Sequence, residues 1–378
     1  MILGIDAHKL DTVNPTGTDK VTSYFVQNID HQLAGEFDKI VLYTKKPISK
    51  SLREQLPPNA INKVLGWPIF WSSLGLSWEM YLHTPDVLFV PSHSLPFVLA
   101  HKNVVIIHDI GFLKYPQNYS PKQYLHLVNT TKLDLKKADY IITISQFVKK
   151  TLIDTYYADP NKIKVVPLGV DREKFVDNFS QKIVDEVLEK YPPTIAKHPY
   201  FFFIGRLDHR KNIVNIIKAF SDFKFKNKTD HVLLLAGKAG HGYQEILKES
   251  EKSSFSSDIV FCDYVSDEDL PVIMSQAEIF LFPTLYEGFG LPILEAQACG
   301  VPVICSNTTS MPEITGDSAL LVNPENFQEI GLAIKKLIDN PTLAVRLREK
   351  GLENIKSYNW QTFSRETLKI LIELSKKI

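Results

Sequence analysis

The chain alternates short β-rich runs with amphipathic helical patterns, and this rhythm occurs twice along the sequence. The β-rich runs lie at residues 2–6, 39–43, 87–90, 104–108, 140–144 and 163–166, and again at 200–204, 231–236, 258–261, 279–282, 302–305 and 319–322. Strands that are separated by helices pair in parallel, and the helices cover both faces of the sheet. The sequence therefore predicts an α/β fold with two Rossmann-like, doubly wound sheets.

The length of the chain also indicates two domains. Its 378 residues exceed the roughly 250 to 300 residues at which a single hydrophobic core stops growing. Prolines at 192, 193 and 199 interrupt both periodicities and remove backbone donors, so we place the linker there. We expect one domain over residues 1–194 and a second over 195–359, followed by a terminal helix at 360–378.

Composition and charge exclude several classes of protein. With 44% hydrophobic and 23% charged residues the chain is expected to be a compact globular protein. Its 43 basic and 43 acidic residues leave no net field that would recruit nucleic acid. The three cysteines form no C-x-x-C pair, the N-terminus does not read as a signal peptide, and no run of about 18 apolar residues occurs. We therefore expect a cytoplasmic protein.

The richest candidate site follows the β-rich run at 279–282. Gly288 and Gly290 precede a short helix that Pro292 is suited to begin, and unpaired amides at a helix N-terminus favour an anion. Glu287 in the loop and Glu295 in the expected first turn would accept hydrogen bonds from hydroxyl groups. The pattern indicates a ligand with both phosphate and hydroxyl groups. The alternative is that both glutamates are solvated and only favour the helix start through its dipole.

A basic cluster follows the β-rich run at 200–204. Gly205 and Arg206 come first, and Arg210 and Lys211 stand just before the next helical pattern. Guanidinium and ammonium groups at a strand end can neutralise a diphosphate. The alternative is a connecting loop with solvated charges, and Arg210 is the residue to which this alternative applies best.

Taken in order, these motifs resemble the family-4 retaining glycosyltransferases. The motifs that carry the resemblance are Gly205-Arg206, Lys211-Asn212, Glu287-Gly-Phe-Gly-Leu-Pro, Glu295 and Gly300-Val-Pro-Val. Supporting fragments are Ala138-Asp-Tyr-Ile-Ile-Thr-Ile-Ser145, Val166-Pro-Leu-Gly-Val-Asp171 and Met311-Pro-Glu313-Ile. The resemblance implies the GT-B architecture, in which two Rossmann-like domains face each other across a cleft. The second domain would hold a nucleotide sugar, the first an acceptor, and the terminal helix would cross back to the first.

The resemblance also implies which residues act. His108 would reach the donor sugar and the reaction centre, although a strand-end histidine that is merely structural is the alternative. Arg206 and Lys211 would hold the pyrophosphate, Glu295 the ribose, and Glu287 the sugar. The full set of expected donor-binding residues is Gly17, Gly205, Arg206, Lys211, Tyr264, Val265, Glu287, Gly288, Phe289, Gly290, Leu291 and Glu295.

The activity implied is the transfer of a hexose from a nucleoside diphosphate sugar to a hydroxyl of a glycan or lipid-linked acceptor. It would retain the donor configuration and need neither a metal nor a cofactor. The segment at 109–116 most resembles mannosyltransferase-like members, which favours GDP-mannose over a UDP-sugar. A membrane-bound acceptor would place the enzyme peripherally at the inner face of the membrane. The alternatives are a nucleotide-sugar 2-epimerase of the same fold and a non-catalytic sugar-nucleotide-binding protein.

Three other features point elsewhere at first sight. The D-x-D of residues 267–269 is a metal motif in another glycosyltransferase architecture, but Ser266 with Asp269 is typical of a helix cap. The glycines at 237, 240 and 242 are not in the order of a dinucleotide fingerprint. We expect the aromatic cluster to be buried helix packing, with a sugar-stacking or membrane-facing surface as alternatives. This cluster is Trp67, Phe70, Trp71, Trp78 and Tyr81.

Overall fold

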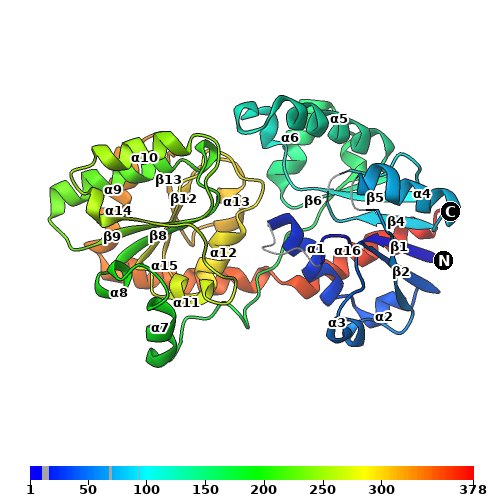
Figure 1. The fold of residues 1–378 in the computed structure, drawn as a ribbon, viewed down its shortest axis with the longest axis horizontal. Coiled ribbons are helices and arrows are strands. Elements are labelled where there is room, and N and C mark those ends of the chain that lie inside the picture. Colours follow the sequence, from blue (N-terminus) through cyan, green and yellow to red (C-terminus); the bar gives the residue numbers. More distant parts are fainter. Residues whose placement is uncertain (11–16, 68–69, 93) are drawn as a thin grey trace. The chain divides into compact units, whose positions relative to one another are not determined.

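The computed structural model describes residues 1–10, 17–67, 70–92 and 94–378, and the chain forms two compact units (Figure 1). The first unit comprises Met1–Leu113, Pro121–Gly169 and Tyr358–Ile378. The second comprises Lys114–Ser120 and Val170–Ser357. Each unit has its own parallel sheet with helices packed against it, as the alternating pattern predicts.

The sheet of the first unit has the strand order β3-β2-β1-β4-β5-β6-β7. Its strands are β1 (Ile2–Asp6), β2 (Lys39–Thr44), β3 (Ala60–Val64), β4 (Val87–Val90), β5 (Lys102–Ile107), β6 (Tyr140–Thr143) and β7 (Ile163–Val165). The central β1 pairs with both β2 and β4, so Ile5 lies between Leu42 and Phe89. The chain winds outward in both directions from here, which makes the carboxyl ends of β1 and β4 the ligand position of this fold.

Strand β3 is absent from the sequence-based prediction. It lies at the edge of the sheet, where it pairs only with β2, and its residues are half-buried or exposed. An edge strand needs few apolar side chains, and polar residues such as Asn62 and Lys63 give it no clear signal.

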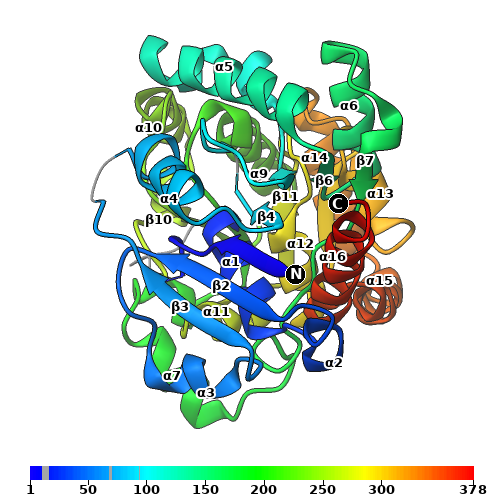
Figure 2. The same ribbon diagram turned by 90° about the vertical axis from the view of Figure 1, so that its right-hand side faces the viewer.

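The helices of the first unit include the last helix of the chain (Figure 2). They are α1 (Gly17–Gln27), α2 (His31–Ala34), α3 (Lys50–Gln55), α4 (Ser77–Leu82), α5 (Pro121–Lys137), α6 (Gln146–Tyr156) and α16 (Trp360–Ser375). Trp360 of α16 stacks on Tyr24 of α1 at 4.5 Å, and the Ser364 hydroxyl donates to the Phe25 carbonyl at 3.2 Å. Aromatic packing therefore holds the C-terminal helix against the first unit.

The expected burial of the aromatic cluster is wrong for most of its members. Trp71 is 5% exposed, but Phe70 is 66% exposed, Trp78 56% and Tyr81 70%.

In the described part of the chain no helix is long and apolar enough to cross a membrane.

The sheet of the second unit has the order β10-β9-β8-β11-β12-β13. Its strands are β8 (Tyr200–Ile204), β9 (Val232–Ala236), β10 (Ile259–Cys262), β11 (Ile279–Phe282), β12 (Val303–Ser306) and β13 (Leu320–Val322). Phenylalanines of β8 and β11 fill the middle of this sheet and are fully buried; Phe203 stacks on Phe282 at 5.9 Å. The positions of these strands agree with the sequence-based prediction to within one residue at either end.

The boundary between the units differs from the predicted linker. The longer segment of the second unit begins at Val170, because the residues before the prolines pack on this unit. Val184 and Val187 of helix α7 are buried, and the Tyr191 hydroxyl donates to Asp269 at 3.0 Å. The prolines therefore lie within the second unit and do not mark the boundary between two domains.

The helices of the second unit surround its sheet. They are α7 (Gln181–Leu188), α8 (Thr194–Lys197), α9 (Ile213–Asn227), α10 (Tyr243–Lys252), α11 (Leu270–Ser275), α12 (Leu291–Ala298), α13 (Met311–Thr315), α14 (Phe327–Ile338) and α15 (Pro341–Asn354). The second unit also contains Lys114–Ser120, a segment from the first half of the chain. Tyr115 of this segment is buried, with its ring 6.0 Å from that of His209 and 6.4 Å from that of Tyr286.

Candidate functional site

The loop that follows β8 is tied to the loop that follows β11. Asn212 donates from its amide to the Pro283 carbonyl at 2.8 Å and to the Pro324 carbonyl at 2.6 Å. The Leu285 amide donates to the Arg210 carbonyl at 2.9 Å. Since β8 and β11 are neighbours in the sheet, these bonds fix two strand-end loops in one position at its carboxyl edge.

Lys211 and Glu287 form an ion pair where these two loops meet. Their side chains are only 11% and 13% exposed, and the Lys211 ammonium lies 5.0 Å from the centre of the Phe282 ring. A charge in such a place is tolerated because its partner neutralises it. The structure thus brings together two residues that the sequence singles out separately. Arg206, by contrast, is exposed.

The loop before α12 presents backbone amides, as the glycine pattern predicts. The Ser310 hydroxyl donates to the Glu287 carbonyl at 2.9 Å, which anchors the loop. Gly290 has a φ of 103° and precedes the first residue of α12, Leu291, and Pro292 lies in the first turn. Gly288 and Phe289 are buried. Phe289 is therefore a packing residue, and only its backbone is available to a ligand.

Glu295 does not lie where the sequence suggests. Helix α12 begins at Leu291, so Glu295 falls just beyond the first turn, which contains no acidic residue. Its side chain is 9% exposed. The dipole effect falls off within the first turn, so the dipole alternative loses its basis for this residue.

Two further candidates follow β10 at the same edge of the sheet. Tyr264 is 45% exposed, and the Lys238 ammonium lies 5.7 Å from its ring centre. Val265 is buried, so its side chain packs and only its backbone is suited to contact a base.

Position 237 requires glycine because of backbone packing, and not because it belongs to a dinucleotide-binding glycine motif. A Cβ atom at Gly237 would lie 1.8 Å from the Gly205 carbonyl oxygen, and the φ of Gly237 is 140°. The loops after β8 and β9 therefore touch backbone to backbone, which holds Gly205 in place. Gly242 has a φ of 83° and precedes the first residue of α10.

The acidic run at 267–269 is a structural element. The Asp269 carboxylate accepts hydrogen bonds from Lys190 at 2.9 Å and from the Tyr191 hydroxyl at 3.0 Å. The Asp269 amide donates to the Ser266 hydroxyl at 3.0 Å, the local bond that the cap interpretation predicts. Asp269 therefore joins the segment that follows α7 to the start of α11.

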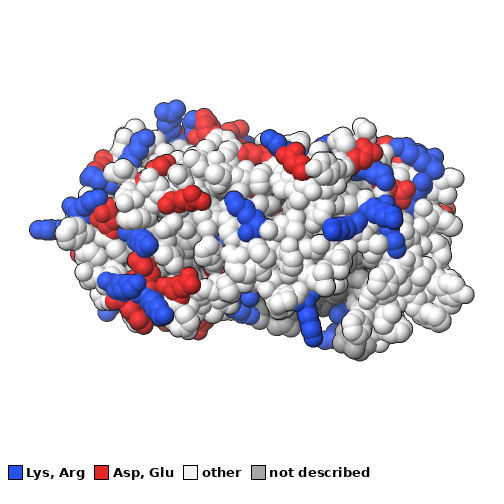
Figure 3. All heavy atoms as spheres, turned by 90° about the horizontal axis from the view of Figure 1, so that it is seen from above, with Lys and Arg blue, Asp and Glu red and all other residues white. Residues whose placement is uncertain are grey.

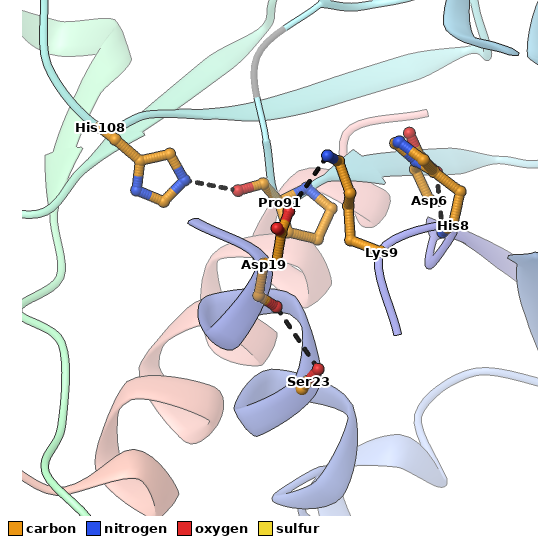
Figure 4. Close-up of polar contacts among 7 residues, drawn as sticks. All are labelled: Asp6, His8, Lys9, Asp19, Ser23, Pro91 and His108. Carbon is orange, nitrogen blue, oxygen red and sulfur yellow. Dashed lines mark hydrogen bonds and ion pairs between the residues drawn. The ribbon is translucent and has the colours of Figure 1, made fainter. Parts of the chain in front are cut away.

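His108 lies in the first unit, directly after β5 (Figure 4). Its Nε2 is 2.9 Å from the Pro91 carbonyl oxygen, which can only accept, so Nε2 carries the ring proton. Burial lowers the pKa of His108, while its bond to Pro91 and the charges of Asp109 and Asp19 oppose that shift. The imidazole is therefore a neutral group at neutral pH.

Sequence analysis misses a polar cluster at the ligand position of the first sheet (Figure 4). Asp6, the last residue of β1, accepts from Trp71 at 3.0 Å and contacts His8 at 2.7 Å. Lys9 pairs with the buried Asp19 at 3.1 Å. The strand-end rule that identifies His108 would also have identified Asp6, whereas Asp19 gives no signal because it resembles any acidic residue in a first helical turn.

Gly17 is the first residue of α1 in the first unit. A Cβ atom placed on it would meet no described atom within 4 Å. Residues 15 and 16 of the predicted loop lie outside the described residues. Gly17 and His108 thus belong to the first unit, and every other candidate belongs to the second.

The neutral state of His108 predicts a pH dependence of stability. In the unfolded chain this histidine takes up a proton near pH 6.5, but its folded pKa is lower. Below about pH 6.5 the unfolded state binds more protons, so His108 makes the fold less stable as the pH falls towards the folded pKa. We expect the free energy of unfolding of wild type, relative to His108→Gln, to decline between about pH 7 and about pH 5 in urea titrations.

Glutamine keeps a donor for Pro91 and does not titrate. Asp134, whose pKa burial raises to about 6, acts in the opposite direction, but it is present in both proteins and cancels in the difference. If the free energies of unfolding of the wild type and His108→Gln changed with pH in parallel, this result would contradict a buried, neutral His108.

Two family models match the two halves of the chain. Glycosyltransferase Family 4 matches residues 26–174, and Glycosyl transferases group 1 matches residues 188–354. The chain belongs to the family-4 glycosyltransferases. The predicted GT-B class and the predicted hexosyltransferase activity are thereby confirmed.

This glycosyltransferase is similar to several known proteins. O-antigen chain mannosyltransferase B of Escherichia coli is 28% identical over 77% of this chain and 75% of its own length. O-antigen chain mannosyltransferase RfbU of Salmonella typhimurium is 25% identical over 80% of each. HepE of Anabaena, solved in complex with UDP-glucose, has a TM-score of 0.71 and 18% identity, with 98% of both chains covered. That last likeness shows the fold alone.

Proposed function

We propose that this glycosyltransferase moves a hexose from a nucleoside diphosphate sugar to a hydroxyl group of a glycan or glycolipid acceptor. The transfer retains the donor's anomeric configuration and uses no metal ion. The observation that carries the proposal is the buried Lys211–Glu287 pair beside the glycine loop and the start of α12. A cation, a carboxylate and helix-terminal amides in one place match a ligand with both phosphate and hydroxyl groups.

The second unit stabilises the leaving group in this proposal. As the bond from the sugar to the phosphate oxygen breaks, the diphosphate gains negative charge and the sugar ring becomes oxocarbenium-like. The side chains of Lys211 and Arg206 stabilise the negative charge on the diphosphate, together with the backbone amides at residues 288–291. Because Lys211 is fixed by its loop before the donor arrives, it needs little reorganisation during the reaction.

The carboxylates contact hydroxyl groups in this proposal. Glu287 accepts from the sugar and Glu295 from the ribose. Glu287 already neutralises Lys211, which makes it a poor nucleophile. We therefore assign the front-face route, in which the departing phosphate oxygen takes the proton of the acceptor hydroxyl as the new glycosidic bond forms on the same face.

The relatives support a hexose donor, and they are consistent with either guanine or uracil as the base of the donor nucleotide. Both O-antigen relatives are named mannosyltransferases, which favours GDP-mannose for this chain. The fold neighbour from Anabaena was solved with UDP-glucose, so a UDP-sugar is the alternative. The mannosyltransferase names also favour a polysaccharide or lipid-linked acceptor.

A donor screen tests this proposal. Thermal unfolding of the wild type with a panel of GDP- and UDP-sugars should show stabilisation by the true donor, about 2.7 kcal/mol at a concentration 100 times its Kd. We expect Glu295→Ala to lose most of this stabilisation because the ribose hydroxyls lose their acceptor. The matched control is Glu349→Ala, which removes an exposed carboxylate on α15. Equal donor stabilisation in Glu295→Ala and wild type would refute the ribose role.

The chemistry is tested with the donor that the screen selects. NMR of the product should show the donor's anomeric configuration, and a chelator should leave the rate unchanged. An inverted product would rule out the front-face route, and a rate that returns only with added metal would rule out metal independence. Donor incubated without acceptor should give slow hydrolysis only. An epimerised donor would favour the 2-epimerase, and binding without turnover on any acceptor would favour a binding protein.

A further inference from the structure

A segment from the first half of the chain packs in the second unit. The chain runs from the first unit into the second at Lys114–Ser120 and then returns to the first. We call Lys114–Ser120 the strap. A 3-10 turn, η3 (Pro116–Asn118), follows Tyr115 within it. Tyr115 is 8% exposed and is the most deeply buried residue of the strap, so its ring is what places the strap on the second unit.

The Tyr115 ring contacts one residue from each of two strand-end loops. Its centre is 6.0 Å from that of the His209 ring, in the loop after β8. It is 6.4 Å from that of the Tyr286 ring, in the loop after β11, with the two rings edge to face. Both distances are typical of aromatic pairs that attract each other. A single side chain of the strap therefore packs on both loops.

The two partners of this ring are next to the ion pair of the candidate site. The 3-10 turn η5 (His209–Lys211) contains both His209 and Lys211. Tyr286 directly precedes Glu287. A shift of His209 therefore moves the backbone that carries Lys211, and a shift of Tyr286 moves the backbone that carries Glu287.

Ring packing, and not charge, holds the strap in place. Lys114 is its one charged residue. On the face that Figure 3 shows, basic and acidic side chains are interspersed over the second unit, at the left. A single exposed lysine gains little from such a surface. Burial raises the pKa of Tyr115, and Glu325 raises it further while Arg210 lowers it, so the phenol is neutral at neutral pH.

We propose that Tyr115 is a positioning residue for the transfer reaction. Its ring holds the two loops so that Lys211 and Glu287 are in place before the donor binds, a role that rests on the proposed function of that pair. A preorganised charge stabilises a developing charge without reorganisation. A displacement of about 1 Å can cost about 10²-fold in rate, so a ring that contacts only the neighbours of the pair affects turnover.

Steady-state kinetics of the full chain test the proposal, with the donor that the thermal screen selects. We expect Tyr115→Leu to lower kcat by about 10- to 100-fold, because leucine fills space but forms no aromatic pair with either loop. The KM for donor should change by less than about threefold, since the loss concerns the transition state. Tyr115→Phe keeps the ring and should turn over close to the wild-type rate. A Tyr115→Phe variant as slow as Tyr115→Leu would overturn the role of the ring.

A second background shows through which residue Tyr115 acts. We expect Tyr115→Leu/Lys211→Met to have the same kcat as Lys211→Met, because a residue that acts through Lys211 has no further effect once the ammonium is gone. An equal fold-loss in both backgrounds would overturn the proposal. Wild-type kcat in Tyr115→Leu beside a low kcat in Lys211→Met would overturn this proposal alone. Wild-type kcat in Lys211→Met would overturn the proposed function as well.

The matched control is Phe223→Leu, which changes a buried ring on α9. The Phe223 ring is 5.5 Å from that of Phe201, near the amino end of β8 and away from the strand-end loops. Phe223→Leu should lower the unfolding temperature and leave kcat close to that of the wild type. An equal loss of kcat in this control would mean that any lost ring slows the enzyme, which contradicts a positioning role.

His209→Ala tests the same contact without the removal of a buried side chain. His209 is exposed, so this variant is expected to fold even where Tyr115→Leu does not. We expect it to lower kcat in the same direction as Tyr115→Leu, with little further loss when the two changes are combined. Wild-type kcat in His209→Ala would show that the ring does not act through the loop after β8, and the proposal would fail.

Discussion

Lys211→Met is expected to lower kcat by about 10²- to 10³-fold, the loss that follows removal of one preorganised donor to a developing negative charge. The ammonium would stabilise the departing diphosphate, and methionine has a similar volume but no charge. The measurement is the steady-state rate of product formation at saturating donor and acceptor.

This substitution also leaves the Glu287 carboxylate buried without its partner, so it is expected to destabilise the second unit by about 3 to 5 kcal/mol. The double variant Lys211→Met/Glu287→Gln removes that charge. We expect it to recover most of the stability while it remains inactive. Recovery of turnover in the double variant would show that the single variant failed through unfolding, and Lys211 would then have no role in the chemistry.

A second ion pair in the same unit, between a buried lysine and a partly exposed aspartate, is a control. Lys224 contacts Asp258 at 2.5 Å near the amino ends of β9 and β10, at the opposite edge of the sheet. Lys224→Met/Asp258→Asn should alter the free energy of unfolding of the second unit. It should leave kcat close to that of the wild type, because these residues lie at the amino ends of the strands and the candidate site lies at the carboxyl ends.

Gly237→Ala is expected to destabilise the second unit by about 4 kcal/mol or more, and to abolish donor binding. The new Cβ atom would overlap the Gly205 carbonyl oxygen, and a φ of 140° is strained for alanine. Relief of the overlap requires the loop with Arg206 to move. Thermal unfolding and the donor-induced shift measure the two effects.

The matched glycine is Gly66, where an added Cβ atom would meet no described atom within 4 Å. Gly66→Ala should have the same unfolding temperature as the wild type, and donor should shift that temperature by the same amount. Wild-type stability in Gly237→Ala would mean that the loops after β8 and β9 do not touch.

Several features of the candidate site follow from local sequence patterns. The alternation of strands and helices predicts two parallel sheets, and parallel strands collect the loops at their carboxyl ends on one edge. For this reason Gly205, Lys211, Glu287 and His108 were found as candidates from the sequence. The helix that begins after Gly290 was also predictable, because glycine and proline restrict the backbone in ways that depend only on the residue itself.

The pairing of these residues was not predictable from local patterns. Lys211 and Glu287 meet because Asn212 fastens one loop to the other, a contact between residues far apart in the chain. Likewise, Gly237 is needed because of Gly205, and only the arrangement of the strands brings the two together.

The sequence by itself determined the fold class, the family and the strand ends at which to look for a site, since periodicity and backbone restriction are local properties of the chain. The tertiary structure decided where the units divide, which carboxylate neutralises Lys211, and that Trp78 and Tyr81 face outward. Burial depends on what packs against a side chain, and an apolar helix has the same sequence pattern whether its second side is covered or exposed.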